Sequence, residues 1–176
     1  MDFSVDVKQQ ELIDLAKTIA EKEVEPRALR IDKSGVIDEE LLKVLKESGM
    51  TQLSVPKEYG GAGIDLLTGA LISEQLSKGC AGVATICAAN SLASFPILFA
   101  GSDMQKRDLF DCLNRGGMAC FALTEPGAGS DAGAVSCRAE KVEGGYILNG
   151  TKCFITNAPI ADKITLFANT LSLIHI

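Results

Sequence analysis

Hydrophobic residues recur at helical spacing between residue 6 and residue 116 of this 176-residue chain. A repeat of three to four residues puts apolar side chains on one face of an amphipathic helix. Five helices are therefore expected, with apolar positions within Leu12–Ile19, Leu41–Leu45, Leu66–Leu76, Ile86–Leu92 and Leu109–Leu113. The fourth is apolar nearly all round, which is typical of a central, buried helix.

Short polar residues mark where these helices begin. Asp6 with Gln9, and Ser102 with Gln105, have the spacing of a capping box, in which each residue satisfies a backbone N–H of the other. Asp38 and Asp65 are expected as N-caps of the second and third helices. The first helix is expected to run towards Pro26, and Gly49 is placed to end the second.

The hydrophobic period changes after Gly116-Gly117. Met118–Leu123, Val135–Val142 and Lys163–Ala168 are expected strands, and Gly144-Gly145 is a hairpin signal.

Asn149-Gly150, the dipeptide favoured in tight turns, predicts a second hairpin. Its outgoing strand would be Cys153–Thr156, with Phe154 and Thr156 on one face. A run of helices followed by a run of strands defines an α+β chain with two segregated regions. We expect a helical domain over residues 1–116 and the start of a β domain over residues 117–170.

The charge balance argues against one class of partner. The chain has 17 Lys and Arg against 23 Asp and Glu, a net charge of −6, so no basic face for nucleic acid is expected. The longest apolar stretch, 81–100, has the length of a membrane span. It contains Asn90 and Pro96 and lacks basic flanks, which favours a buried helix and no membrane association.

The six cysteines show no Cys-x-x-Cys spacing, so no metal site is expected. Several lie on apolar runs, as small buried residues do in a reducing compartment. The N-terminus lacks a signal or transit pattern. We expect a cytoplasmic protein.

The last six residues, 171–176, read Leu-Ser-Leu-Ile-His-Ile and follow a strand region that has barely begun. In this frame they match the translation of a widely used transposon sequencing adapter. We therefore expect a non-native tail and a natural protein that continues, and assign His175 no chemical role. The alternative is a genuine short protein that ends in an edge strand.

Two segments carry the candidate chemistry. The first segment, 121–130, reads Phe-Ala-Leu-Thr-Glu-Pro-Gly-Ala-Gly-Ser, a strand that enters a glycine-containing turn. Glycines let a ligand approach the main chain, and successive N–H groups in such a turn can bind a phosphate. The second segment, 150–157, reads Gly-Thr-Lys-Cys-Phe-Ile-Thr-Asn.

In this order and at this separation, the two segments resemble the flavin-contacting segments of the acyl-CoA dehydrogenase family. Segments 56–63, 90–92 and 100–106 agree with that family, so the resemblance runs from about Met1 to Asn169. It implies a helical domain followed by an incomplete β-barrel-like domain. It also implies FAD as cofactor and α,β-dehydrogenation of a fatty acyl-CoA to a trans-2-enoyl-CoA.

The resemblance assigns residues to the cofactor and to the substrate. Those assigned to FAD are Phe121, Ala122, Leu123, Thr124, Gly127, Ala128, Gly129, Ser130, Phe154, Ile155 and Thr156. Those assigned to acyl-CoA are Ser130, Thr85, Asn90 and Phe95. Many family members have tryptophan where Phe154 stands, which bears on how the flavin ring is covered.

Simpler structural readings remain open at several of these positions. Phe121 and Leu123 are also typical of a strand core, and Ser130 of a plain turn. Phe-Ile-Thr is an ordinary strand sequence. Small residues on the apolar helix would equally serve close helix packing.

The resemblance implies that the catalytic base lies in a C-terminal helical domain, which we do not expect within this chain. Glu125 is therefore not expected to be the base, and the 176-residue chain is expected to be inactive and to bind FAD weakly or not at all. The resemblance further implies an electron-transferring flavoprotein as electron acceptor and a homo-oligomer. Alternatives are an acyl-CoA oxidase, a dehydrogenase of branched or dicarboxylic acyl groups, and a non-catalytic helical module with a phosphate-binding turn.

Overall fold

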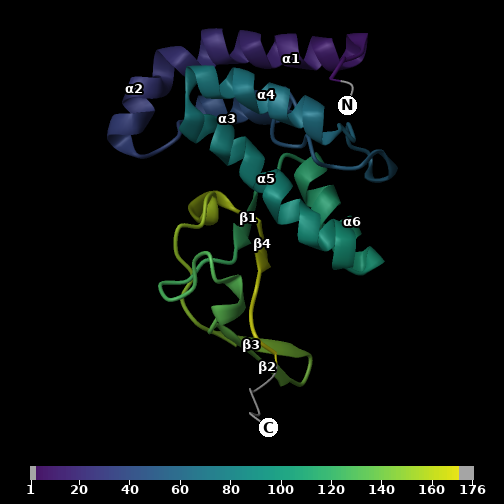
Figure 1. The fold of residues 1–176 in the computed structure, drawn as a ribbon, viewed down its shortest axis with the longest axis vertical. Coiled ribbons are helices and arrows are strands. Elements are labelled where there is room, and N and C mark those ends of the chain that lie inside the picture. Colours follow the sequence, from purple (N-terminus) through teal and green to yellow (C-terminus); the bar gives the residue numbers. More distant parts are fainter. Residues whose placement is uncertain (1–2, 171–176) are drawn as a thin grey trace.

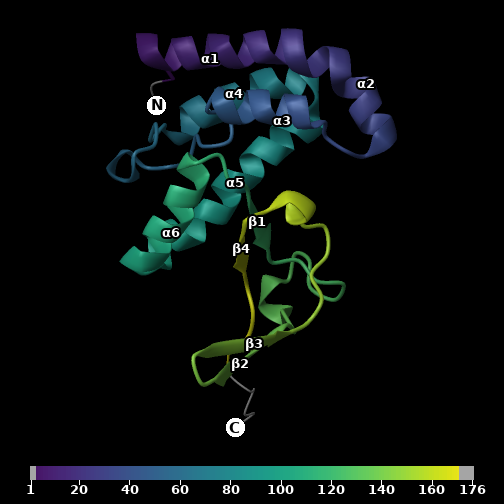
Figure 2. The ribbon, with the colours of Figure 1, turned by 180° about the vertical axis from the view of Figure 1, so that it is seen from behind.

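The computed structural model describes residues 3–170, with helices at one end of the molecule and strands at the other (Figures 1 and 2). The proposed tail, 171–176, lies outside the described residues. Helices α1 (Val7–Ile19), α3 (Glu39–Glu47) and α4 (Leu66–Gly79) gather at the helical end. Helix α5 (Ala81–Ala100) leads from them to the strands, and α6 (Asp103–Asn114) packs beside it.

The expected helix caps are confirmed. The Asp6 carboxylate accepts the Gln9 N–H at 2.8 Å, and the Gln9 side chain accepts the Asp6 N–H at 2.7 Å. Asp38 and Asp65 cap α3 and α4, and Ser102 forms a capping box at the start of α6. Capping hydrogen bonds join residues within one helical turn, so a few neighbouring residues of the sequence are enough to predict them.

The first helix does not end near Pro26. One π-helical turn (Ala20–Val24) follows α1, and the chain continues as α2 (Glu25–Ser34), which Gly35 ends in a left-handed conformation at φ 68°. Pro26 lies in the first turn of α2, directly after the π turn. The wider π turn bends the helix around the core while keeping it continuous.

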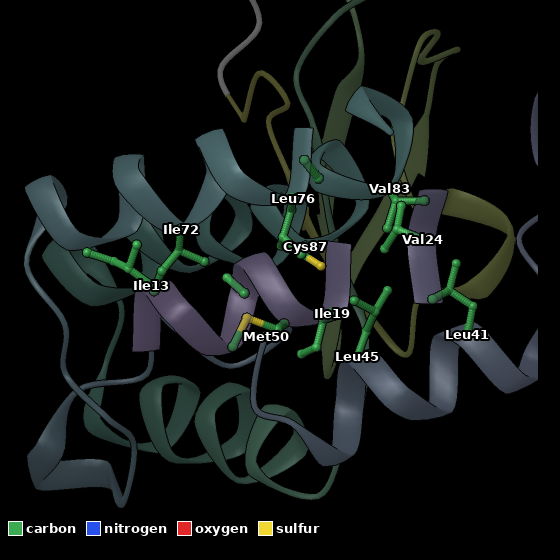
Figure 3. Packing of buried hydrophobic residues seen from close by; sticks show 12 residues of the cluster. Ile13, Ile19, Val24, Leu41, Leu45, Met50, Ile72, Leu76, Val83 and Cys87 are labelled. Carbon is green, nitrogen blue, oxygen red and sulfur yellow. The ribbon is translucent and has the colours of Figure 1, made fainter. Parts of the chain in front are cut away.

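A cluster of buried apolar side chains joins α1, α3, α4 and the start of α5 (Figure 3). Ile13 and Ile19 meet Leu45 and Ile72 there, with Met50 beneath them. A second cluster, which includes Phe110 and Leu113, packs α6 against β1. Both clusters contain mainly helical residues, so the helical end has its own core.

The strands form two separate pairs. β1 (Ala119–Ala122) pairs in parallel with β4 (Lys163–Leu166), with Ala119 opposite Lys163. β2 (Arg138–Val142) and β3 (Gly145–Asn149) form the hairpin predicted at Gly144-Gly145, and Gly144 has φ 81°. The α+β class is confirmed, and these strands form no closed barrel among the described residues.

The predicted second hairpin is wrong. Residues 150–157 form no strand, and two of them have left-handed backbone conformations, Phe154 at φ 56° and Asn157 at φ 69°. Strand geometry would need negative φ at both positions. The side chains of Phe154 and Thr156 therefore do not share one face of a strand.

Helix α5 is central to the molecule. It packs against α4, α6, β1 and β4, although it is also the one described helix long and apolar enough to cross a membrane. Its polar groups are bonded inside the protein: the buried Ser94 hydroxyl donates to the Asn90 carbonyl at 2.7 Å, and Ala93 O accepts the Thr165 hydroxyl of β4 at 2.7 Å. These contacts are typical of a core helix.

Candidate functional site

A cavity of about 1440 Å³ lies along α4 and α5 and reaches the strand end of the molecule. We call it the α4–α5 cavity. One wall is apolar and includes Leu92 and Phe95 of α5 and Leu66 of α4. A mainly apolar hollow with a small number of polar groups is the usual form of a small-molecule site.

The cavity brings together residues from both parts of the sequence prediction. The predicted substrate residues Thr85 and Phe95 line it from α5. The predicted flavin residues that line it are Phe121, Thr124, Phe154 and Thr156. Residues more than 60 positions apart in the sequence therefore meet at one site, which periodicity alone could not predict.

The two segments lie side by side, which explains how their hydroxyls reach one cavity. The Cys153 N–H donates to the Thr124 carbonyl at 3.0 Å. One residue earlier, the Lys152 ammonium donates to the Leu123 carbonyl at 2.9 Å. The second segment is thus held along the first by its backbone and by one buried side chain.

Glu125 and Lys152 form a buried ion pair at 2.8 Å beneath this junction. The carboxylate also accepts the Ser136 N–H and hydroxyl, each at 2.7 Å, and the Cys137 N–H at 2.9 Å. The Lys152 bond, and next the Ser136 bonds, lower the pKa of Glu125 from its ordinary value of 4.5 to about 2. A carboxylate held this firmly in its ionised form, and absent from the cavity wall, is unsuited to proton abstraction. Its role is to hold the two segments together.

Phe154 stands out in the second segment. It is 93% exposed, so almost none of its ring contacts the protein. Its left-handed backbone is uncommon for a bulky residue and persists only where the surrounding structure enforces it. An aromatic ring held at the edge of a cavity by an unfavourable backbone points to a ligand that covers it.

The glycine-containing turn of the first segment lies outside the α4–α5 cavity. Glu125 and Ala128 exchange backbone hydrogen bonds at 3.0 and 3.1 Å, which closes the turn. Gly127 and Gly129 do not have positive φ, and a Cβ on either would meet nothing within 4 Å. Backbone conformation therefore does not require these glycines. Both glycines and Ser130 are exposed, so the main chain is open to a ligand here.

Three of the other predicted flavin residues lie off the cavity wall. Ala122 is buried within β1, and Leu123 packs in a small cluster with Ala128 and Leu166. Ile155 is half-buried and does not line the cavity. The strand-core interpretation fits Leu123. Phe121 combines both, because it lines the cavity and packs against the ring of Phe167, with centroids 5.2 Å apart.

The predicted substrate contact of Asn90 is not supported by its position. Asn90 is fully buried and does not line the cavity. Its amide donates to the Thr51 carbonyl at 2.8 Å, and its oxygen accepts the Ala119 N–H at 2.8 Å. On a helix, residue 90 faces away from Thr85 and Phe95, so its side chain joins α5 to β1 instead.

Sequence reasoning missed Lys152 and Asn157, which fix the two ends of the second segment. Lys152 binds the first segment, and Asn157 reaches α5 through the Ile86 carbonyl at 2.9 Å. One signal was available for Asn157, because asparagine adopts left-handed conformations more readily than most residues. No local signal marks Lys152, whose partner Glu125 lies 27 residues earlier.

The residues present fit a flavin. Two threonine hydroxyls and an uncovered aromatic ring adjoin an elongated cavity, and the open main chain of the turn is suited to a phosphate. Among residues 3–170, no group of three His, Cys, Asp or Glu could hold a metal ion. The donor set is therefore typical of an organic cofactor with ring nitrogens, carbonyls and phosphates.

Comparison with known proteins agrees with this geometry. The model described as "Acyl-CoA dehydrogenase, N-terminal domain" matches residues 6–117, and "Acyl-CoA dehydrogenase, middle domain" matches residues 120–173. The chain belongs to the acyl-CoA dehydrogenase family, as the sequence predicted.

Two curated relatives illustrate the range of the family. The chain is 46% identical over 167 residues to a 3-(aryl)acrylate reductase of Clostridium sporogenes, covering 93% of this chain and 44% of that protein. It is 41% identical over 163 residues to the human mitochondrial short-chain specific acyl-CoA dehydrogenase, covering 92% of this chain and 40% of that protein. The chain therefore spans less than half the length of these relatives.

Solved structures share the fold. Butyryl-CoA dehydrogenase from Megasphaera elsdenii matches with a TM-score of 0.87 and 38% identity, over 98% of this chain and 46% of that one. A structure described as an FAD complex of PigA matches with a TM-score of 0.81 and 34% identity, over 97% of this chain and 46% of that one. The predicted cofactor, FAD, is confirmed by these relationships.

Proposed function

We propose that the protein to which this chain contributes is an FAD-dependent dehydrogenase of a saturated, short-chain acyl-CoA. The observation that carries the proposal is the exposed ring of Phe154, held beside Thr124 and Thr156 at the α4–α5 cavity. The named activities of the human short-chain and Megasphaera butyryl-CoA dehydrogenases support a short acyl group.

The residues of this chain would bind and orient the reactants. FAD accepts a hydride when bound, and the protein sets its orientation and electronic environment. Phe154 would cover one face of the flavin ring, and the hydroxyls of Thr124 and Thr156 would donate hydrogen bonds to it. Thr85 and Phe95 would line the acyl chain. The apolar wall would exclude water from the reacting carbons.

We propose that the base comes from outside this chain. Removal of a proton next to a thioester needs a carboxylate within hydrogen-bond reach. Among the described residues, the carboxylates on the cavity wall are Glu58 and Asp65. Asp65 caps α4, and its bonds to Thr68 lower its pKa, which makes it a poor base. Glu58 is exposed to solvent, outside the dry surroundings that such a base needs. We therefore expect the 176-residue chain alone to form no enoyl-CoA.

A second candidate is reduction of an acrylate-type double bond. Its support is the relationship to the 3-(aryl)acrylate reductase and to an acryloyl-CoA reductase (NADH) of Anaerotignum propionicum, 40% identical over 173 residues. The same flavin and acyl positions would serve hydride transfer in the opposite direction. With the dehydrogenase function we also propose an electron-transferring flavoprotein as electron acceptor, a homo-oligomer and a cytoplasmic location.

An anaerobic experiment on the whole protein tests these functions. Adding butyryl-CoA to the oxidised protein should bleach the flavin band if it is a dehydrogenase. If the protein is a reductase, acryloyl-CoA should restore that band in the dithionite-reduced protein while butyryl-CoA fails to bleach it in the oxidised protein. A reduced flavin that reacts rapidly with oxygen would indicate an oxidase instead.

A matched pair of variants tests the site itself. T156A should weaken FAD binding about tenfold, because the proposed hydrogen bond from the Thr156 hydroxyl to the flavin is lost. T18A removes a remote hydroxyl whose donor bond goes to the Asp14 carbonyl within α1, so it should leave FAD affinity unchanged. Equal FAD affinity of T156A, T124A and the unaltered protein would favour the non-catalytic helical module.

A further inference from the structure

We propose that Asn157, acting through Asn90, is a positioning residue that fixes Phe154 and Thr156 relative to the cavity-lining helix α5. The inference rests on the proposed function, because it assumes that Phe154 and Thr156 contact the flavin. It assigns a role to two asparagines that do not line the α4–α5 cavity.

The amide nitrogen of Asn157 faces three acceptors. It donates to the Ile86 carbonyl of α5 at 2.9 Å, to the Ala119 carbonyl of β1 at 3.2 Å and to the Asn90 side-chain oxygen at 3.4 Å. Three oxygens around one nitrogen also fix which way the amide points, because a flipped amide would place oxygen against oxygen. A single side chain thus connects the second segment to both α5 and β1.

Asn90 extends the same connection through the core. Its oxygen accepts the Ala119 N–H at 2.8 Å, while its nitrogen donates to the Thr51 carbonyl at 2.8 Å. Asn90 is fully buried and Asn157 is 6% exposed, so these bonds are protected from competing water. The polar junction therefore links α5, β1, the loop at Thr51 and the second segment.

Asn157 retains two features that ordinarily destabilise a fold. Its backbone is left-handed at φ 69°, and its buried side-chain oxygen has no hydrogen-bond partner among the described residues. Features of this kind concentrate at functional sites, where the surrounding structure enforces them. At Asn157 they accompany a precise orientation of the segment that carries Phe154.

The segment is consequently anchored at both ends. Lys152 holds its start to the first segment, and Asn157 holds its end to α5. Phe154 and Thr156 lie between the two anchors. Because α5 also contributes Thr85 and Phe95 to the cavity, the distance between flavin-facing and acyl-facing residues is set by the asparagine junction.

Two substitutions separate side-chain bonding from backbone conformation. N157G keeps the left-handed backbone without strain and removes all three donor bonds. N157D keeps the size of the side chain but places a carboxylate oxygen against three acceptor oxygens. Both should loosen the second segment, and N157D should do so at least as strongly.

T165V is a matched control. It removes one buried hydrogen bond that also joins the strand end to α5, from the Thr165 hydroxyl to the Ala93 carbonyl at 2.7 Å. Thr165 lies in β4 and does not line the α4–α5 cavity. T165V therefore measures the effect of losing one hydrogen bond to α5 while Lys152 and Asn157 still hold the second segment.

Hydrogen–deuterium exchange of the full chain, followed by mass spectrometry, decides the local part of the proposal. N157G and N157D should speed exchange of residues 152–160 about tenfold, the factor expected from losing roughly 1.4 kcal/mol of local protection. T165V should speed exchange in β4 and leave 152–160 unchanged. Equal exchange of residues 152–160 in N157G and in the unaltered chain would overturn the proposal.

FAD binding to the whole protein decides the functional part. N157G and N157D should weaken FAD binding about tenfold and shift the flavin absorption band, while T165V changes neither. If N157G and T165V affect FAD alike, Asn157 is merely structural. If the unaltered protein binds no FAD, the proposed function fails, and the exchange experiment still reports whether Asn157 holds the segment.

Discussion

Replacing Phe154 by glycine should leave the folded chain about as stable as before or slightly more stable, while removing one face of the flavin site. Phe154 is 93% exposed, so only a small part of its surface is removed from water. Taking 150–250 Å² for a phenylalanine, burial of that small part contributes only about 0.4 kcal/mol at 25 cal/mol per Å².

The backbone term has the opposite sign. A left-handed conformation costs an L-residue about 1–2 kcal/mol, and glycine at φ 56° avoids that cost. Glycine loses about 0.5–1 kcal/mol through its greater freedom in the unfolded chain. The three contributions sum to between a loss of about 0.4 kcal/mol and a gain of about 1.1 kcal/mol for F154G.

Phe99 supplies the matched control. It is 80% exposed and lines the same cavity, but it lies in α5, where glycine is unfavourable. F99G should therefore destabilise the chain by about 1 kcal/mol, from helix propensity and lost burial. The same substitution is thus expected to lower the stability of the chain more at Phe99 than at Phe154.

Urea unfolding followed by circular dichroism measures both variants. A loss of more than about 1 kcal/mol in F154G would show that Phe154 packs against the fold and refute the reasoning. In the whole protein, F154G should also weaken FAD binding about tenfold, the loss expected when an aromatic contact of about 1 kcal/mol or more disappears. Unchanged FAD affinity would remove Phe154 from the flavin site.

Three further outcomes are expected. E125Q should be less stable than the unaltered chain at pH 7. The urea midpoints of the two proteins should converge as the pH falls from about 4.5 to 2. The lowered pKa of Glu125 confers stability that is complete above pH 4.5 and is lost when the carboxylate is protonated. A pH-independent difference would contradict this. G150A should lower stability by about 1–3 kcal/mol, because its Cβ would lie 2.7 Å from the Cα of Cys137, whereas G145A meets nothing within 4 Å and should change stability little. Burial raises the pKa of Cys87 to about 12, so iodoacetamide at pH 8 should label it far more slowly than the two partly exposed thiols; comparable labelling by mass spectrometry would indicate an open core.

Local features of the fold could be predicted from the sequence, while features fixed by distant partners could not. The capping residues Asp6, Asp65 and Ser102 bond within one helical turn, so their roles follow from a window of four residues. The continuation of the helix past Pro26 could not be predicted, because it depends on the π turn that precedes this residue. The strand predicted at Phe154 is wrong because this residue has a left-handed backbone, in a segment whose two ends bond to distant parts of the chain.

The candidate site divides in the same way. Motif resemblance found Thr124 and Thr156, which the structure brings to one cavity. It also assigned Asn90 to the substrate, although the amide of that side chain bonds to Thr51 and Ala119 inside the protein. The motif position of Asn90 does not reveal which way its side chain faces. Its partner Ala119 lies in a strand 29 residues later in the sequence, so no local pattern indicates the contact.

The two faces of helix α5 differ in how freely their residues can be substituted. Its cavity face carries Thr85, Leu92 and Phe95, and none of these three side chains makes a hydrogen bond to the strands within residues 3–170, so they can change size without disturbing the strands. Its other face, with Asn90 and Ala93, is committed to the strand end of the molecule. Residues on one stripe of this helix can therefore be exchanged to reshape the α4–α5 cavity, while residues on the stripe behind it keep their hydrogen bonds to the strand end.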